Sequence, residues 1–405
     1  MSAGREQRAL VVGAGLAGAA VCAELTRRGW HVTLVDAAAG AAQAASALPV
    51  GMLSPHVTRA PTPLSRLSAL GVADMQAELA RLLPPGEGWQ ACDVDNLGHD
   101  PGRWPAALVR PAALVNAWLS EAAATGRLQT RWSAPIARLR HEAETGHPCR
   151  WIALDTGGHE VAHAPWVVVA SALGSLSLLQ DTDAHLGLDA LPLRPVKGQM
   201  SLAELSGPPL AERPLRNNGV FVPLYEDPGL APAWPTRIWS MGSTYHRGDS
   251  STTLSDADHE CNRESLQAIH PDAARHMAQA ARTGALMGWA QVRCASLDRL
   301  PLMGAVPHVE RLQVEMAAAG HRRGRLPLSQ VPRHEGLYVL SALGSRGLTL
   351  AHWCARQLAA QMAGDTASDV EPDLLQALDP ARFAWRRARK QGRVGVDVSE
   401  IAAER

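Results

Sequence analysis

The sequence lacks a hydrophobic run that could cross a membrane. Of its 405 residues 46% are hydrophobic, yet no window approaches the ~18 unbroken apolar residues that a spanning helix requires. It also lacks an excess of charge of either sign, because 39 basic residues balance 39 acidic ones. We therefore expect a cytoplasmic protein without a membrane partner, whose contacts with nucleic acid would have to come from a local basic patch.

Cysteine spacing gives no sign of a metal site. The six cysteines are scattered without a C-x-x-C pair, which favours free thiols in a reducing compartment and argues against zinc. We therefore expect no metal. The chain is long enough for two or more structural units with a large core, and it contains no repeats.

The most informative stretch is residues 8–36. Apolar runs predict buried strands over Ala9–Val12 and Val32–Val35. Between them we expect a helix over Leu16–Arg28, which Gly29 ends. A G-x-G-x-x-G turn joins the first strand to this helix and consists of Gly13, Ala14, Gly15, Leu16, Ala17 and Gly18.

Strand, glycine turn, helix and strand together predict a dinucleotide site. Gly15 lets the backbone approach a pyrophosphate, and the helix N-terminus offers unpaired N–H groups and a partial positive charge. Asp36 and the adjacent Ala37 follow the second strand, where a carboxylate can accept hydrogen bonds from a ribose. A glycine-rich packing turn is the alternative interpretation.

The next segments alternate between loops and helices. Ser46, Gly51 and Met52 lie in a stretch of small residues that suits close approach of the backbone to a flat ligand, although an ordinary Gly/Pro loop would look the same. Periodicity predicts a helix over Leu64–Leu83. The polar stretch 86–104 is expected to cross to another domain.

A second set of elements returns to the dinucleotide fold. Pro111 opens a helix that Gly126 ends, and residues 131–140 and 151–154 are expected as strands of a small antiparallel piece. The all-apolar strand 166–170 is followed by small residues that include Ala172. A central parallel strand meets a cofactor in this way, and a plain buried strand is the alternative.

A mostly antiparallel sheet is expected in the middle of the chain. Its β-like runs are Leu193–Leu205, Gly219–Tyr225 and Arg237–Thr244. Ser255 is expected to cap a helix that continues through Ile269 and stops at Pro271. Residues 288–304 then return from this sheet.

The last strand and turn complete a pattern that favours FAD over a nicotinamide cofactor. Residues 337–340 predict a strand, and a helix starts at Leu348. We expect this helix to point its N-terminus at an isoalloxazine ring, where reduction places negative charge. The N–H groups would come from Gly344, Ser345, Gly347 and Leu348. An ordinary glycine turn before a helix is the alternative.

Four stretches carry a resemblance to a known family. They are residues 242–248, 292–296, 298–304 and 342–348, which read GSTYHRG, VRCAS, DRLPLMG and ALGSRGL. The order of elements resembles the amine-oxidising flavoproteins that include glycine oxidase, sarcosine oxidase and D-amino-acid oxidase. Within that superfamily the stretches resemble the oxidoreductase domain of the bacterial bifunctional enzymes of tRNA 5-methylaminomethyl-2-thiouridine biosynthesis. The chain is expected to be that domain standing alone.

The resemblance implies an α/β fold: a Rossmann-like FAD-binding domain of the D-amino-acid oxidase type, with an inserted, mostly antiparallel substrate domain. The FAD-binding domain is expected over residues 1–60, 107–190 and 290–405, and the substrate-binding domain over 61–106 and 191–289. The implied reaction is oxidative removal of the carboxymethyl group from 5-carboxymethylaminomethyl-(2-thio)uridine at the tRNA wobble position, which gives 5-aminomethyl-(2-thio)uridine and glyoxylate.

The resemblance also assigns roles to three side chains. Arg293 lies where glycine-oxidising relatives carry the arginine that binds the substrate carboxylate, with a salt bridge between sheet and loop as the alternative. Arg346 is the second candidate for the carboxylate and lies in the flavin turn. Tyr245 is expected to line the pocket or to lie in the core. Cys294 is interpreted as a structural thiol.

Two basic segments bear on partners. Arginines and a lysine crowd the C-terminus at 382, 386, 387, 389, 390 and 393, and residues 321–325 form a second basic loop. They are read as phosphate contacts for tRNA or as solvated surface, and Trp385 as a base-stacking side chain or an anchor. A separate methyltransferase acting on the product is a further expected partner. The alternative functions are a small-molecule amine oxidase or dehydrogenase for glycine, sarcosine or a D-amino acid, and a flavin-containing assembly protein without turnover.

Overall fold

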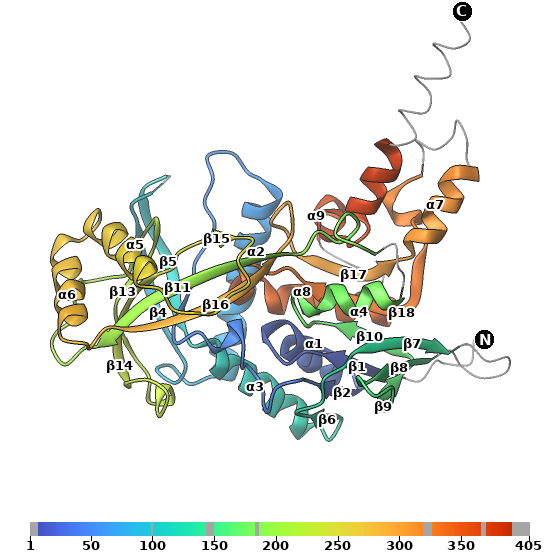
Figure 1. Ribbon diagram of the computed structural model, residues 1–405, viewed down its shortest axis with the longest axis horizontal. Helices are drawn as coiled ribbons and strands as arrows, with labels where there is room; N and C mark the ends of the chain where they lie inside the picture. The colour runs from blue at the N-terminus through green and yellow to red at the C-terminus, as the bar shows by residue number, and fades with distance from the viewer. Residues whose placement is uncertain are drawn as a thin grey trace, which may run out of the picture.

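In the computed structural model the described part of the chain forms two large sheets that lie side by side, and a small three-stranded sheet (Figure 1). The structure describes residues 7–98, 100–142, 150–182, 186–318, 326–365 and 370–390. The first sheet lies in the right half of Figure 1, and the second sheet lies mainly in the left half. The mixed α/β fold expected from the sequence is confirmed.

Within the described residues the first sheet has six strands in the order β17-β18-β10-β1-β2-β6. All neighbours are parallel except the antiparallel pair β17 and β18. Its strands are β1 (Arg8–Val12), β2 (His31–Val35), β6 (Leu128–Arg131), β10 (Trp166–Val169), β17 (Leu302–Pro307) and β18 (Arg333–Ser341). The expected strands at 9–12, 32–35, 166–170 and 337–340 are therefore present.

Both faces of this sheet are covered, which explains why its central strands are apolar throughout. Ala9 and Val11 of β1 pack with helices on one face, whereas Leu10 and Val12 pack on the other. The helical face carries α1 (Leu16–Arg27), α2 (Pro63–Leu82), α3 (Pro111–Ala124) and α8 (Gly347–Ala363). The other face carries α4 (Gly174–Thr182), α7 (Val309–Ala318) and a small sheet of β7 (Arg138–Glu142), β8 (Arg150–Leu154) and β9 (Glu160–Ala164).

The second sheet is built mainly from antiparallel pairs, with one parallel pair between β4 and β12. Its order is β15-β11-β14-β13-β12-β4-β5-β3, and β16 also pairs with β11. The strands are β3 (Gly51–Leu53), β4 (Trp89–Asn96), β5 (Gly102–Val109), β11 (Arg194–Glu204), β12 (Leu215–Asn217), β13 (Gly219–Glu226), β14 (Arg237–Gly242), β15 (His246–Arg247) and β16 (Met287–Ala295).

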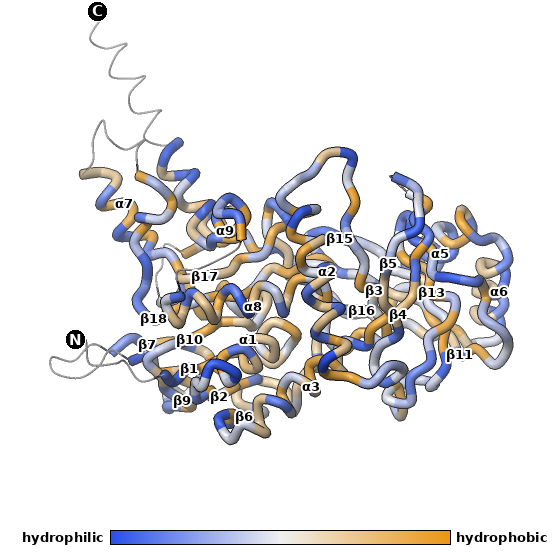
Figure 2. Tube along the Cα trace, turned by 180° about the vertical axis from the view of Figure 1, so that it is seen from behind, coloured by the Kyte–Doolittle hydropathy of each residue, from blue (hydrophilic) through white to orange (hydrophobic). Residues whose placement is uncertain are grey.

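Two helices, α5 (Asp256–Gln267) and α6 (Pro271–Arg282), pack over one face of the second sheet, and α9 (Pro372–Leu378) lies near α2. A further helix covers residues 382–390. Figure 2 shows both sheets from behind, with hydrophobic residues concentrated along the strands and the buried helices.

Three local expectations need correction. Residues 86–104 do not form a simple crossing but contain β4 and the start of β5, a hairpin that joins the second sheet. The strand expected over 131–140 is divided: residue 131 ends β6 in the parallel sheet, and β7 begins at 138. Ser255 is the N-cap residue of α5, but its side chain makes no capping hydrogen bond; its backbone N–H donates to Gln199 Oε1. Pro271 starts α6, which the sequence analysis missed.

The domain boundaries expected from the sequence stay a prediction. Two elements, however, pack with a different sheet from the one that these boundaries would suggest. Strand β3 belongs to the second sheet, pairing with β5, although its residues were assigned to the FAD-binding domain. Helix α2 packs against α8 in the helical layer of the first sheet, although its residues were assigned to the substrate domain. The chain therefore passes between the two sheets more often than a single insertion would require.

A buried ion network joins the four helices of that layer. His352 of α8 is 6% exposed and lies 2.7 Å from Asp74 of α2 and 3.2 Å from Glu24 of α1. Trp118 of α3 stacks on the imidazole ring and donates its indole N–H to Glu78. Burial alone would lower the pKa of His352, but these carboxylates raise it to about 9.

This network predicts a fold that loses stability in mild alkali. The pKa of His352 rises from 6.5 in an unfolded chain to about 9 in the fold, so its contribution is complete below pH 6.5 and disappears as the pH rises through about 9. The unfolding free-energy difference between the protein and its His352→Gln variant should shrink by roughly 3 kcal/mol across that interval. Urea melts at several pH values measure it. The exposed His31→Gln change is the control, and a pH-independent difference for His352→Gln would contradict the assignment.

Candidate cofactor and substrate site

Three turns meet at the carboxyl edge of the first sheet. They follow β1, β10 and β18, which are parallel neighbours, so their ends lie at the same edge. A Cβ on Gly13 would lie 2.7 Å from the carbonyl oxygen of Ala170, so the turns after β1 and β10 touch. Ser341 at the end of β18 donates to the carbonyl of Ala172 at 3.1 Å.

The first turn leaves several backbone N–H groups unpaired. The N–H of Gly13 donates to Val35, and that of Ala14 donates to the Asp36 carboxylate at 2.6 Å. Among the described residues no acceptor pairs with the N–H groups of Gly15, Ala17 and Gly18. Helix α1 has Gly15 at its N-cap and no side-chain cap. These free donors and the helix dipole form a cradle for an anion.

Ser46 and Asp36 shape this cradle. The Ser46 hydroxyl accepts from the Leu16 N–H at 3.1 Å, which places it against the start of α1. Asp36 also accepts from the Ala38 N–H at 2.7 Å, so both carboxylate oxygens are oriented by backbone donors. The neighbouring Ala37 is exposed.

The turn before α8 forms a second set of donors, with one correction. The N–H of Gly344 is not free, because it donates to the Cys294 carbonyl at 2.8 Å. In the described part of the chain the N–H groups of Ser345, Gly347 and Leu348 have no acceptor. Helix α8 has Arg346 at its N-cap and no side-chain cap. The N-terminus of α8 therefore also presents free N–H groups and the partial positive charge of the helix dipole.

Contacts between small residues hold the two helix starts together. A Cβ on Gly347 would lie 3.0 Å from the Leu16 side chain. A Cβ on Gly51 would lie 2.7 Å from the Leu348 side chain, which sets β3 against the start of α8. Met52 is half-buried in β3, beside this contact. The structure thus brings the predicted cofactor residues of all three turns to one place.

Arg293 lies on β16, whose end is beside the turn before α8. An isolated bridge between Ala295 and Leu343 connects the end of its strand to the turn before α8. The guanidinium lies over Gly198 and donates to the Ser243 hydroxyl, and its centre is 5.8 Å from the ring of Tyr245. Among the described residues it has no carboxylate partner, so the salt-bridge alternative is not supported. Burial lowers the pKa of Arg293.

Tyr245 and Arg346 complete the group. The Tyr245 side chain is 48% exposed, which excludes the core alternative, and its ring also lies 5.8 Å from the Arg247 guanidinium. Arg346 is half-buried, and burial followed by the charge of Arg299 lowers its pKa. These positions form an electropositive surface that suits an anionic substrate.

Sequence reasoning missed three members of this surface. Arg216 donates to Ser54 and to the Pro55 carbonyl, next to His56. Burial followed by the charges of Arg346, Arg216 and Arg299 lowers the pKa of His56 to about 4. Arg299 lies in the stretch 298–304 that carries the family resemblance, but it was given no role there, and no sequence pattern signals Arg216 or His56. The three come from different segments, so only the fold unites them.

The basic C-terminal helix is only partly available to a ligand. Arg382 is 1% exposed and forms two 2.9 Å bonds with Asp298, so it cannot contact an external phosphate. Trp385 donates its indole N–H to Leu326 at 2.8 Å, which favours the anchor interpretation. Arg387 pairs with Asp189, and Arg386 lies 3.7 Å from Asp298. Arg393 and the basic loop 321–325 lie outside the described residues.

Cysteine and histidine chemistry contributes little to the site. Cys294 is buried, and burial raises its pKa, which keeps it a neutral thiol. Residues 159–163 read His-Glu-Val-Ala-His, a spacing that binds metal when it lies on a helix. Here it falls in a turn and in β9, with His159 against Asp155 and His163 against Glu160. Across the described residues no group of three such side chains is arranged so that it could hold a metal ion. No helix in the same part of the chain is long and apolar enough to span a membrane.

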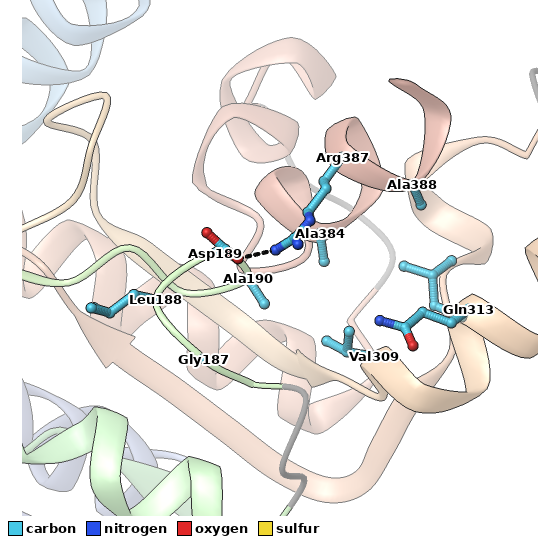
Figure 3. A pocket seen from close by; sticks show the side chains of 10 residues that line it. Gly187, Leu188, Asp189, Ala190, Val309, Gln313, Ala384, Arg387 and Ala388 are labelled. Atoms are coloured by element: carbon cyan, nitrogen blue, oxygen red, sulfur yellow. Dashed lines mark hydrogen bonds and ion pairs between the residues drawn. The ribbon is translucent and has the colours of Figure 1, made fainter. Parts of the chain in front are cut away.

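A cavity of about 380 Å³ lies away from these turns, between residues 187–190, α7 and the helix 382–390 (Figure 3). Arg387 and Asp189 pair across one side of it. The residues that line it include none of those expected to bind cofactor or substrate. We therefore place the site at the three turns, where donors and charges converge.

Comparison with known proteins supports the fold and shows the family. A family model described as FAD dependent oxidoreductase matches residues 8–107 and 103–361. Among solved structures, glycine oxidase from Geobacillus kaustophilus is 19% identical, with a TM-score of 0.67 over 93% of this chain and 99% of that one. Iminodiacetate oxidase from Chelativorans sp. BNC1 is 17% identical, with a TM-score of 0.63 over 92% and 99%.

Curated relatives are closer in sequence. The tRNA 5-methylaminomethyl-2-thiouridine biosynthesis bifunctional protein MnmC of Verminephrobacter eiseniae is 33% identical over 92% of this chain and 63% of its own length. The protein of the same name from Paracidovorax citrulli is 33% identical over 94% and 61%. The chain thus spans about three fifths of the relatives that it matches. The resemblance noted in the sequence is confirmed.

The residues at the three turns fit FAD. Unpaired N–H groups at the start of α1 suit a pyrophosphate, and Asp36 lies where a ribose would be bound. Unpaired N–H groups at the start of α8 suit an electron-rich ring edge. Contacts at Gly13, Gly51 and Gly347 leave no space for a larger side chain. At these positions no side chain covers the backbone, so backbone atoms line the cradle.

Asp36→Ala should weaken FAD binding by about 10- to 100-fold, because it removes a carboxylate that orients the turn and accepts from a ribose. Flavin retained after gel filtration measures the effect. Asp93→Ala, at an exposed position in β4, is the matched control. Equal flavin content in the two variants would argue against this role for Asp36.

Proposed function

Because the chain belongs to the family of FAD-dependent oxidoreductases, we propose that it acts on a modified uridine of tRNA. The proposed reaction removes the carboxymethyl group from 5-carboxymethylaminomethyl-(2-thio)uridine at the wobble position by oxidation. Its products are 5-aminomethyl-(2-thio)uridine and glyoxylate. The donor bond is therefore the CH–NH bond of a secondary amine.

One observation carries the proposal most directly: Arg293 is a half-buried guanidinium without a carboxylate partner among the described residues, beside the turn that starts α8. An unpaired buried charge costs free energy unless a ligand of opposite charge completes it. The carboxymethyl arm of the substrate supplies such a carboxylate. The 33%-identical relatives are named for tRNA 5-methylaminomethyl-2-thiouridine biosynthesis, which supports a modified uridine of tRNA as the substrate class.

The side chains of this protein have positioning roles in the proposed reaction. Arg293 binds the carboxylate through two parallel N–H groups and so fixes the direction of the adjacent methylene. Tyr245 would lie next to the carboxymethyl arm on the solvent side of the pocket, since its ring lies 5.8 Å from the Arg293 guanidinium. Holding the methylene in one orientation accounts for much of the rate, because a substrate that binds with a neutral amine needs no separate catalytic base.

FAD, when bound, accepts a hydride from the methylene carbon. The substrate amine must be neutral, because its lone pair forms the C=N bond as the hydride leaves. The surrounding cations, Arg293 and Arg346, favour that neutral form by repelling a proton on the amine. Water then adds to the carbon of the C=N bond, and the C–N bond breaks to release glyoxylate and the primary amine.

The proposed product and substrate suggest a further enzyme that acts next and the compartment in which the protein works. A primary aminomethyl group is a substrate for methylation, so we expect a methyltransferase to act next. A tRNA substrate implies work in the cytoplasm. No metal is needed in this scheme, because the electron pair passes to the flavin and the proton passes to water.

The reaction is tested with tRNA isolated from cells that lack this step. Incubation with the holoenzyme should convert carboxymethylaminomethyluridine to aminomethyluridine by nucleoside mass spectrometry and release one glyoxylate per uridine. Glycine, sarcosine and D-alanine are the comparison substrates. Turnover of those amines without turnover of tRNA would replace the proposal with a small-molecule amine oxidase.

Arg293→Ala should lower kcat/KM for the carboxymethylaminomethyl substrate by about 100-fold or more, because two charge-assisted hydrogen bonds are lost. Flavin content should remain unchanged. Arg293→Lys should recover part of the loss, since it restores the charge without the paired donors. A substrate analogue without the carboxylate should be insensitive to either change. Unaltered kinetics in Arg293→Ala would contradict the role of this side chain.

A further inference from the structure

The cations beside the site exceed what one carboxylate requires. Arg216, on β12 of the second sheet, is half-buried and held in place by three neutral acceptors: Ser54 Oγ and the Pro55 carbonyl at 2.8 Å, and Asn96 Oδ1 at 3.1 Å. No carboxylate in the described part of the chain pairs with it. Neutral acceptors fix the direction of the guanidinium but leave its charge uncompensated.

Arg299 lies in a turn that the fold holds rigidly. The turn follows β16, and Asp298 accepts from Ser296, from the Leu300 N–H and from two nitrogens of Arg382. Arg299 itself has a φ of 64°, the left-handed region that non-glycine residues avoid. Its side chain is exposed, and the structure gives it no acidic partner among the described residues. An arginine held in an unfavourable conformation by a buried ion pair suggests a functional requirement.

Backbone contacts bring these two arginines to Arg346. The bridge between Ala295 and Leu343 sets the Arg299 turn beside the turn before α8. The contact between Gly51 and Leu348 sets the segment that anchors Arg216 against the start of the same helix. The low pKa of His56 agrees with this arrangement, since after burial the three arginines are its causes. His56 is thus a neutral side chain among cations at neutral pH.

We propose that Arg216 and Arg299, together with Arg346, bind a phosphodiester of the polynucleotide next to the uridine whose arm Arg293 holds. This inference rests on the proposed function and adds a second anchor to it. A wobble uridine within a chain carries a phosphate on each side, and a free glycine carries none. Guanidinium groups are suited to phosphate because they bind its oxygens through paired donors.

The phosphates of FAD are the competing occupant, and the structure offers them a different place. Unpaired N–H groups at the start of α1 lie on the G-x-G-x-x-G turn, between β1 and β2. Arg216 comes from the second sheet and Arg299 from the turn after β16, both outside that unit. The arginine group is therefore expected to serve the substrate rather than the pyrophosphate.

The test is a binding cycle that needs no turnover. The probe is an anticodon-loop oligoribonucleotide with carboxymethylaminomethyluridine at the wobble position, and its companion has a neutral methylphosphonate in place of one phosphodiester beside that uridine, made in both positions. Fluorescence anisotropy with the holoenzyme measures affinity. Arg299→Ala and Arg216→Gln should each weaken binding of the charged probe by about 10-fold and lower the dependence of log K on log salt by roughly one unit.

The decisive result is non-additivity. One of the two methylphosphonates should weaken binding to the original protein, and Arg299→Ala should cost nothing further with that probe. Arg282→Ala, at the end of α6, which lies at the far left of Figure 1, is the control and should behave as the unmodified protein. Equal losses with charged and neutral probes would overturn the inference, as would absence of binding.

Two further outcomes separate this inference from its competitors. Loss of flavin in both Arg216→Gln and Arg299→Ala would assign the cations to FAD and overturn the inference. If tRNA is not oxidised but the binding cycle gives the expected coupling, the proposed reaction fails while the phosphodiester site stands. Arg299→Ala carries the conclusion if Arg216→Gln fails to fold, because Arg299 is exposed and makes no contact that the fold needs.

Discussion

Backbone N–H groups at the starts of two helices impose the main constraint on this structure. Helices α1 and α8 both begin at the carboxyl edge of the parallel sheet, and neither has a side-chain cap. Unsatisfied donors at a helix start cost free energy unless water or a ligand accepts from them. In the placement proposed here FAD would satisfy both starts at once, because it has phosphates at one place and an electron-rich ring at another. The cofactor and the fold are thus complementary.

The rest of the helical layer keeps the two starts in position. His352, Asp74, Glu24 and Glu78 connect α8 to α1 and α2 through buried charges, where the removal of one partner is costly. Small residues between the helix starts allow their close approach. Arg293 belongs to the second sheet. The residue proposed to bind the substrate and the residues proposed to bind the cofactor therefore belong to different sheets. The bridge from Ala295 to Leu343 is where the two meet.

Local patterns made much of this fold predictable. The strands of the parallel sheet, the helices at 16, 63, 111 and 347 and the antiparallel pairs follow from apolar periodicity and from glycine and proline positions. The single strand expected over residues 131–140 was wrong, because the end of a parallel edge strand and the start of a strand of the small sheet lie close in sequence and have similar residue patterns. The hairpin at 89–109 was not predicted, because its many polar residues are typical of a loop. Only its packing in the second sheet distinguishes it from one.

The candidate site was predictable only where one segment carries its own signal. The G-x-G-x-x-G turn and Asp36 do so, whereas Gly344 was misassigned because its N–H bonds to Cys294, a contact made across 50 residues of sequence. Arg382 looked like part of a basic tail until burial against Asp298 was visible. Arg216, Arg299 and His56 come together only through tertiary contacts, so no local pattern could have united them.

The central claim is that Arg293 holds a glycyl arm where bound FAD can oxidise it, and anaerobic titration tests this most directly. The holoenzyme is mixed without oxygen with tRNA that carries carboxymethylaminomethyluridine, and flavin absorbance is followed. The account predicts complete bleaching at one modified uridine per flavin, with one glyoxylate released. A flavin that stays oxidised with this tRNA, or that bleaches equally with tRNA lacking the carboxymethyl group, would contradict it.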